Sequence, residues 1–354
     1  MDISDILREV VNKNASDLHL TVGLPPVVRV DGRLETLDMP VLKPNDTRDL
    51  IYSILTQDQR QKLETDWEVD LSFSLYGVAR FRVNAFFQRG TLSAAFRLIP
   101  VAIKSIDELG LPKILHTFVH KPRGLVLVTG PTGSGKSTTL AAIIDEINET
   151  RNDHIVTIED PIEFLHSHKR CVINQREVGA DTKAFPIALR SALRQDPDII
   201  LIGEMRDLET IQIALTAAET GHLIFATLHT QDCPQTIDRM IDVFPPHQQE
   251  QIRVQIAATL EGVVTQQLLP KAGGIGRVAA CEVLIATPAV RNLIREGKTH
   301  QLYTVMQTGG QYGMQTMNAA LADLVRRGEI TRELALRRSS MPDELERLLL
   351  MGAA

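Results

Sequence analysis

The sequence contains little cysteine: three residues in 354, namely Cys171, Cys233 and Cys281. They are far apart and form no C-x-x-C pair, which is the usual spacing in cysteine-rich zinc sites. So few cysteines also exclude a disulfide framework and favour a reducing compartment. We therefore expect three ordinary small apolar residues and no zinc.

Long hydrophobic runs and an excess of positive charge are also absent. No stretch approaches the roughly 18 consecutive apolar residues that a membrane-spanning helix needs. Charges interrupt the apolar positions of the first residues, unlike those of a secretory signal peptide. The net charge is −6, whereas proteins that bind nucleic acid are commonly basic. Since 44% of the residues are hydrophobic, we expect a soluble cytoplasmic protein with a substantial core and no nucleic-acid partner.

The residues that are present indicate an α/β chain of two domains. Residues 1–98 combine short strands with helices, one of them expected over 45–63, which is typical of a small α+β domain. Residues 99–106 are expected to form a linker. Over 107–354, continuous apolar strands alternate with helices and indicate a largely parallel sheet covered on both faces. These strands are expected at 125–129, 155–158, 198–202 and 223–227, and the chain is mostly helical from about residue 289.

The strongest motif is a phosphate-binding loop of the pattern G-x-x-x-x-G-K-[ST]. It joins the strand at 125–129 to a helix, and its glycines let the backbone N–H groups point inward beside the positive end of that helix. Lys136 is expected to reach the outer phosphates of ATP as a binding and catalytic residue, and the Ser137 hydroxyl to bind Mg²⁺. The predicted nucleotide-binding residues are Gly130, Pro131, Thr132, Gly133, Ser134, Gly135, Lys136, Ser137 and Thr138.

Glu204 follows the apolar strand at 198–202. Ligands of such folds sit beyond the carboxyl ends of parallel strands, and we expect this strand to lie beside the strand of the phosphate loop. Glu204 would then face the terminal phosphate and orient or deprotonate the attacking water. Gly203 stands where many nucleotide hydrolases carry a Mg²⁺-binding Asp, so another acid is needed. The alternative is a solvated charge at a strand end.

That other acid is expected among Glu159, Asp160 and Glu163, which follow the strand at 155–158. Three carboxylates within five residues repel one another unless a cation lies nearby. We predict that Glu159 and Asp160 line the nucleotide site and that Glu163 shares the catalytic role with Glu204. The alternative is a polar loop with no catalytic task.

Two histidines bracket the strand at 223–227. His229 follows its carboxyl end and is predicted to contact the γ-phosphate, whereas His222 precedes the strand and could serve a subunit contact. A shared metal is excluded, because residues seven positions apart across an extended strand cannot converge on one ion. A purely structural role is the alternative for both.

Arg80 and Arg82 share one face of a strand in the first domain, and Phe81 and Val83 share the other. One interpretation is a solvated polar face above an apolar core. The other is that these arginines reach the phosphates bound by a neighbouring subunit. The two interpretations carry equal weight.

The order of these segments resembles the secretion ATPase superfamily that powers type II secretion and type IV pili. Residues 289–296, AVRNLIRE, are similar to a motif of its pilus retraction branch. The resemblance covers almost the full length, without the extra N-terminal domain and four-cysteine module of the extension and secretion branches. It implies a PAS-like domain before a RecA-like P-loop ATPase domain. It further implies homohexamers with ATP between the two domains, and a platform protein at the inner-membrane face as partner.

The leading hypothesis is therefore a hexameric, ATP-hydrolysing motor that withdraws pilin subunits. A paralogous, accessory retraction ATPase carries most of the same segments and is both an alternative identity and a further partner. A nucleic-acid translocase with the same core is disfavoured by the acidic composition. A non-catalytic regulator that only binds ATP is kept open by Gly203, and Lys136 and Glu204 weigh against it.

Overall fold

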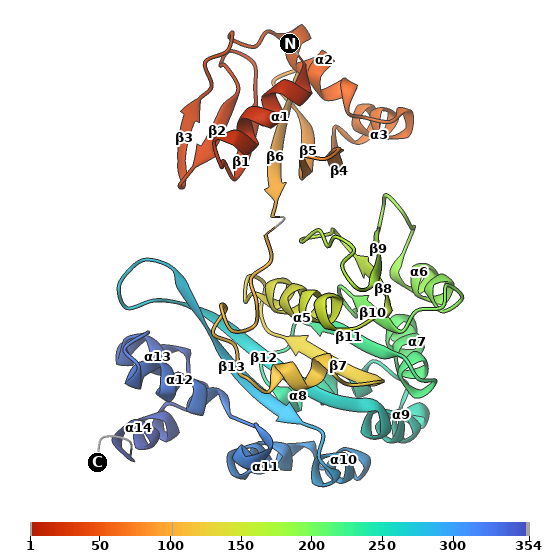
Figure 1. Cartoon of the computed structure of the whole chain (residues 1–354), viewed down its shortest axis with the longest axis vertical. Helices are drawn as coiled ribbons and strands as arrows, with labels where there is room; N and C mark the ends of the chain where they lie inside the picture. Colours follow the sequence, from red (N-terminus) through yellow and green to blue (C-terminus); the bar gives the residue numbers. More distant parts are fainter. Residues whose placement is uncertain (1, 101, 352–354) are drawn as a thin grey trace. The chain divides into compact units, whose positions relative to one another are not determined.

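The structure is a computed structural model that describes residues 2–100 and 102–351. It divides into two compact units, one on each side of residue 101 (Figure 1). Each unit has its own sheet and its own hydrophobic core. The predicted linker begins inside a strand, because Ile99 ends the last strand of the first unit. Residue 101 of that linker lies outside the described residues.

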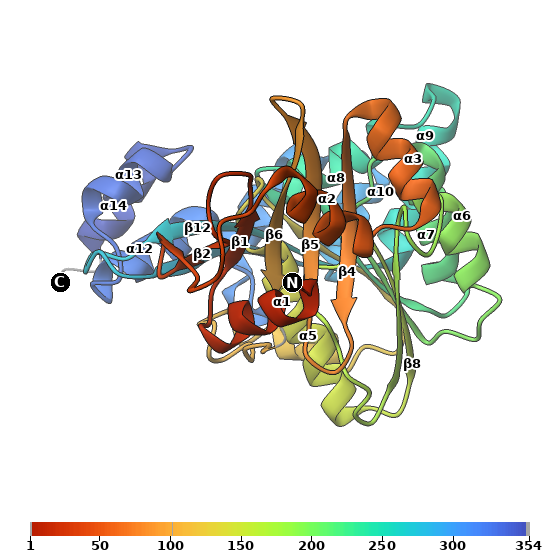
Figure 2. The ribbon, with the colours of Figure 1, turned by 90° about the horizontal axis from the view of Figure 1, so that it is seen from above.

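The N-terminal unit is a six-stranded antiparallel sheet with the order β3-β2-β1-β6-β5-β4. Helices α1 and α2 cover one face, where they lie in front of the strands in Figure 2. The core beneath them includes Leu7, Ile51 and Phe96. The elements are α1 Ile3–Asn12, β1 Asp17–Leu20, β2 Val27–Val30, β3 Arg33–Thr36, α2 Pro44–Ser53, α3 Gln57–Asp66, β4 Glu68–Leu75, β5 Ala79–Gln88 and β6 Thr91–Ile99.

The single helix predicted over 45–63 is wrong, because two helices, α2 and α3, occupy this region. Thr56 begins α3 with a capping box: its hydroxyl accepts from the Gln59 N–H at 3.3 Å, and the Gln59 side chain accepts from the Thr56 N–H at 2.9 Å. Ile54 and Leu55, between the helices, are buried in the core. The break was readable in the sequence as a T-x-x-Q cap.

The C-terminal unit contains a seven-stranded sheet with the order β13-β12-β7-β11-β10-β8-β9. Its strands are parallel except for β13, which pairs antiparallel with β12. The four predicted strands are all present, whereas β9, β12 and β13 were not predicted. The bounds are β7 Gly124–Thr129, β8 His154–Glu159, β9 Val172–Glu177, β10 Ile199–Ile202, β11 Leu223–Leu228, β12 Leu260–Pro270 and β13 Arg277–Ile285.

Helices cover both faces of this sheet, as predicted (Figure 1). Helices α4 and α5 pack on one face, and α6 to α11 pack on the other. Helices α12 to α14 form a smaller cluster against β13. No helix within residues 2–100 and 102–351 is long and apolar enough to cross a membrane. The bounds are α4 Leu115–Val119, α5 Lys136–Thr150, α6 Phe185–Ala192, α7 Leu208–Glu219, α8 Cys233–Asp242, α9 Pro246–Thr259, α10 Pro288–Arg295, α11 Leu302–Thr308, α12 Met317–Arg326, α13 Arg332–Arg338 and α14 Pro342–Met351.

Candidate active site

The candidate residues gather where β7, β11, β10 and β8 end, at the carboxyl edge of the parallel sheet. The expectation that β10 lies beside β7 is wrong, because β11 separates them. The strand between them ends at Leu228, so His229 emerges between the phosphate loop and Glu204. The sheet order thus places the histidine between the two segments that the sequence singles out most strongly.

The phosphate loop has the backbone that only glycine adopts without strain. Gly130, Gly133 and Gly135 have φ angles of 136°, 78° and 90°. At Gly130 even a Cβ is excluded, since it would lie 2.3 Å from the carbonyl oxygen of Gln266. Helix α5 begins directly after Gly135, so its free N–H groups and positive end face the loop.

Lys136 folds back over the phosphate loop. Its ammonium donates to the carbonyl oxygens of Gly130 at 2.9 Å and Pro131 at 3.1 Å, and it lies 3.5 Å from His229 Nδ1. Burial lowers the pKa of Lys136, and the charges of Glu204 and Glu163 oppose that shift. The ammonium of Lys136 therefore lies against the loop carbonyl oxygens and within electrostatic reach of both carboxylates.

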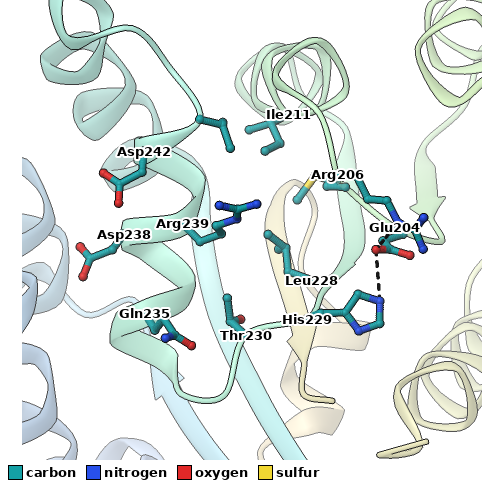
Figure 3. A pocket seen from close by; sticks show the side chains of 12 residues that line it. Glu204, Arg206, Ile211, Leu228, His229, Thr230, Gln235, Asp238, Arg239 and Asp242 are labelled. Atoms are coloured by element: carbon teal, nitrogen blue, oxygen red, sulfur yellow. Dashed lines mark ion pairs between the residues drawn. The ribbon is translucent and has the colours of Figure 1, made fainter. Parts of the chain in front are cut away.

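Glu204 is held by two partners from different segments (Figure 3). His229 Nε2 lies 3.1 Å from Glu204 Oε1, and the Arg206 guanidinium pairs with the same oxygen. Burial by itself would raise the pKa of Glu204, but Arg206 and His229 together hold this pKa below its ordinary value. Glu204 is therefore a carboxylate at neutral pH. A continuous line of contacts runs from Lys136 through His229 to Glu204.

Glu159 is fixed from both sides at the end of β8. The Thr157 hydroxyl donates to Glu159 Oε1 at 2.6 Å, and the Gln175 amide donates to it at 3.2 Å. Burial raises the pKa of Glu159. Glu159 and Ser137 line one small cavity of about 30 Å³ together with Gly203. Ser137 and Glu159 therefore border one shared space.

The wall of that small cavity also includes His166, whose Nδ1 is buried and has no hydrogen-bond partner within the two described ranges. Burial lowers the pKa of His166 to about 4. The neighbouring acids are less enclosed, because Asp160 and Glu163 are both exposed. The acidic segment therefore offers one enclosed carboxylate, Glu159, and two solvated ones.

The donor set fits a polyphosphate with a divalent cation. Ser134 Oγ is buried without a hydrogen-bond partner in the part of the chain that the structure describes. The backbone around it curls at Gly130 and Gly135, where the position of a Cβ is crowded by Gln266. Lys136 supplies a cation and the start of α5 supplies N–H donors. The oxygens of Ser137 and Glu159 suit Mg²⁺.

Not every predicted residue belongs to this cluster. Arg80 and Arg82 lie on β5 of the N-terminal unit, on the face opposite the buried Phe81 and Val83, and their role at the phosphates stays a prediction. His222 lies at the other end of β11, where its Nδ1 is 3.0 Å from the Ala217 carbonyl oxygen.

The residues of the cluster that were missed from the sequence include Arg206, His166, Gln175 and Gln266. Arg206 could have been found, because it lies two positions after Glu204. Gln175 and Gln266 come from β9 and β12, which no periodic pattern indicated. A cavity of about 560 Å³ also opens beside Glu204, and Arg239 of α8 extends into it (Figure 3).

Comparisons with known proteins identify the family of the chain. The family model of type II/IV secretion system proteins matches residues 1–337. The type IV pilus retractation ATPase PilT of Pseudomonas aeruginosa is 54% identical over 343 residues, which is 97% of this chain and 99% of that protein. The type IV pilus ATPase PilU of the same organism is 41% identical over 353 residues, 100% of this chain and 92% of that protein.

A solved structure is similar over both units. The pilus retraction motor PilT with bound ADP matches with a TM-score of 0.90 at 53% identity and covers 98% of this chain and 99% of that chain. This likeness confirms the predicted mixed α/β fold and the predicted resemblance to pilus retraction ATPases. The chain therefore belongs to the type II/IV secretion system protein family and is a nucleotide-binding ATPase of that family.

Proposed function

We propose that this chain hydrolyses ATP to power the retraction of type IV pili. The observation that carries the proposal is the line of contacts Lys136–His229–Glu204 at the phosphate loop. It joins a cation for the phosphates to a carboxylate at the same sheet edge. The similarity to the pilus retractation ATPase PilT supports the choice of a pilus as the object moved.

Each residue of the site takes a role that its contacts support. The loop N–H groups and Lys136 would bind the phosphates, and Ser137 would hold Mg²⁺, with Glu159 nearby. The bound Mg²⁺ would neutralise charge on the phosphates. Glu204, ionised at neutral pH, orients or deprotonates the attacking water. His229 lies between Lys136 and Glu204, where it would contact the terminal phosphate.

The motor acts, in this proposal, as a homohexamer in the cytoplasm at the inner-membrane face. Asp160 would lie among the groups around ATP, and Arg80 and Arg82 of the PAS-like domain would reach the phosphates bound by the RecA-like domain of a neighbouring subunit. The partner would be the platform protein of the pilus machine. ATP hydrolysis would move the domains of the motor, and this movement would be passed on to the platform protein. The exposed polar face that carries Arg82 leaves this arginine free to act on a neighbouring subunit.

The decisive experiment compares ATP turnover by the wild type and Glu204→Gln, with the oligomer mass measured on the same samples. We expect the variant to assemble and bind ATP while its kcat falls at least about 100-fold, the usual loss when a general base is removed. Glu209→Gln is the matched control. Glu209 lies close to Glu204 in the sequence, but its side chain pairs with the exposed Arg190. Equal turnover by wild type and Glu204→Gln would refute the catalytic role.

A second function, that of an accessory retraction ATPase, is favoured by the full-length similarity to PilU. Expressing the gene in a strain that lacks its own primary retraction ATPase separates the two. Restored pilus retraction supports the primary motor. Restoration only when a primary ATPase is also present would support the accessory role. In the turnover assay, slow ATP hydrolysis that Glu204→Gln does not change would support a regulator that only binds ATP.

A further inference from the structure

Gln266 is a buried amide beneath the phosphate loop. It lies on β12, whose neighbouring residue Thr265 is in register with Thr129, the last residue before the loop. The side chain is 1% exposed. Its Nε2 donates to the Ser134 carbonyl oxygen at 2.7 Å, and its Oε1 accepts from the Thr139 hydroxyl at 2.9 Å. One side chain thus joins the loop to the first turn of α5.

The rest of Gln266 is fitted to the loop as closely as its amide. Its backbone carbonyl oxygen occupies the space that a Cβ at Gly130 would need, 2.3 Å away. Its Nε2 lies 3.0 Å from the position of a Cβ at Gly135. Gln266 therefore contacts the loop at its first glycine, at Ser134 and at its last glycine. No other polar side chain of β12 donates to a loop carbonyl oxygen among the described hydrogen bonds.

A loop rich in glycine loses much conformational entropy when it is ordered around a ligand. A contact that fixes the loop beforehand removes part of that cost and so raises affinity. The Ser134 peptide is the one that Gln266 holds, and turning it would redirect the N–H of Gly135 away from a bound phosphate. The hydrogen bond from Gln266 to the Ser134 carbonyl therefore fixes the direction of the Gly135 N–H, the group that binds phosphate.

We propose that Gln266 is a positioning residue for nucleotide binding: its amide holds the phosphate loop in the conformation that receives phosphates. This inference rests on the proposed function, since it concerns the same nucleotide site. Gln266 touches the loop rather than the reacting atoms. Its loss should therefore weaken ground-state and transition-state binding equally, which raises KM and leaves kcat unchanged.

The test measures the Kd of ATP and ADP by direct binding, with KM and kcat, for wild type, Gln266→Leu and Gln266→Met. The thioether of Gln266→Met keeps the length of the side chain and adds no charge, but it cannot donate to the Ser134 carbonyl oxygen. We expect both variants to raise KM and both Kd values about tenfold, the effect of losing one buried hydrogen bond. The kcat should change less than about twofold.

Gln267→Leu is the matched control, because its side chain lies on the same strand and is only partly buried. It should retain wild-type affinity. Wild-type Kd and KM in the Gln266 variants would overturn the inference, and so would a fall in kcat at unchanged KM. If Gln266→Leu does not fold, Gln266→Met decides alone. Absence of turnover in the wild type would count against the proposed function, whereas the Kd comparison would still decide the role of Gln266.

Discussion

Replacing Glu282 should destabilise the C-terminal unit through two helices at once. Glu282 lies on β13 and is 2% exposed. Its Oε1 accepts from the N–H of Cys233 at 2.7 Å and its Oε2 from the N–H of Met317 at 3.2 Å. These are the first residues of α8 and α12. Burial raises the pKa of Glu282, and the two backbone N–H donors oppose that rise.

The size of the effect follows from the donors left without an acceptor. A buried N–H that loses its partner costs about 1–3 kcal/mol, so Glu282→Leu should lower the free energy of unfolding by about 2–6 kcal/mol. Glu282→Gln keeps one acceptor oxygen and should cost about half as much. The larger loss is a substantial part of the roughly 5–15 kcal/mol that stabilises a typical domain.

The assay is urea unfolding followed by far-ultraviolet circular dichroism at neutral pH, with the slopes compared to establish that one transition is followed. Glu333→Leu is the control, because Glu333 is 75% exposed on α13 and should change stability little. The order of destabilisation should be Leu, then Gln, at position 282. A Glu282→Leu variant within about 1 kcal/mol of the wild type would refute the reasoning, since the two N–H groups would then have found other partners.

Two further predictions concern the loop glycines and a histidine. Gly130→Ala should weaken ATP binding at least about 100-fold, because its Cβ would collide with Gln266 and displace the loop. Gly133→Ala has open space around its Cβ. It should therefore cost only about 1 kcal/mol of backbone strain and keep most of the affinity for ATP. Equal affinities by equilibrium binding would contradict this. The hydrogen bond to Glu146 raises the pKa of His116 above its ordinary 6.5. The stabilisation of the folded chain by the contact between protonated His116 and Glu146 is therefore full below pH 6.5. It is lost as the pH rises through the raised pKa. His116→Ala should lose this pH dependence in thermal unfolding, and an unchanged profile would rule the contact out as its source.

The sequence by itself determined the features that depend on neighbouring residues. The phosphate loop is contiguous, so its glycines, Lys136 and Ser137 are recognisable without a structure. Apolar strands between helices predicted a parallel sheet, and in such a sheet all carboxyl ends share an edge. That rule was sufficient to bring Glu204, His229 and Glu159 to the same place, even though the expected neighbour of β7 was wrong.

Only the tertiary structure decided which strands are neighbours and what supports the site from beneath. Strand β11, rather than β10, lies beside β7 and carries His229 between Lys136 and Glu204. The amide of Gln266 meets a loop 132 positions earlier in the chain. Such contacts leave no periodic or local pattern, because they depend on the order in which strands pair and on space that only packed side chains define.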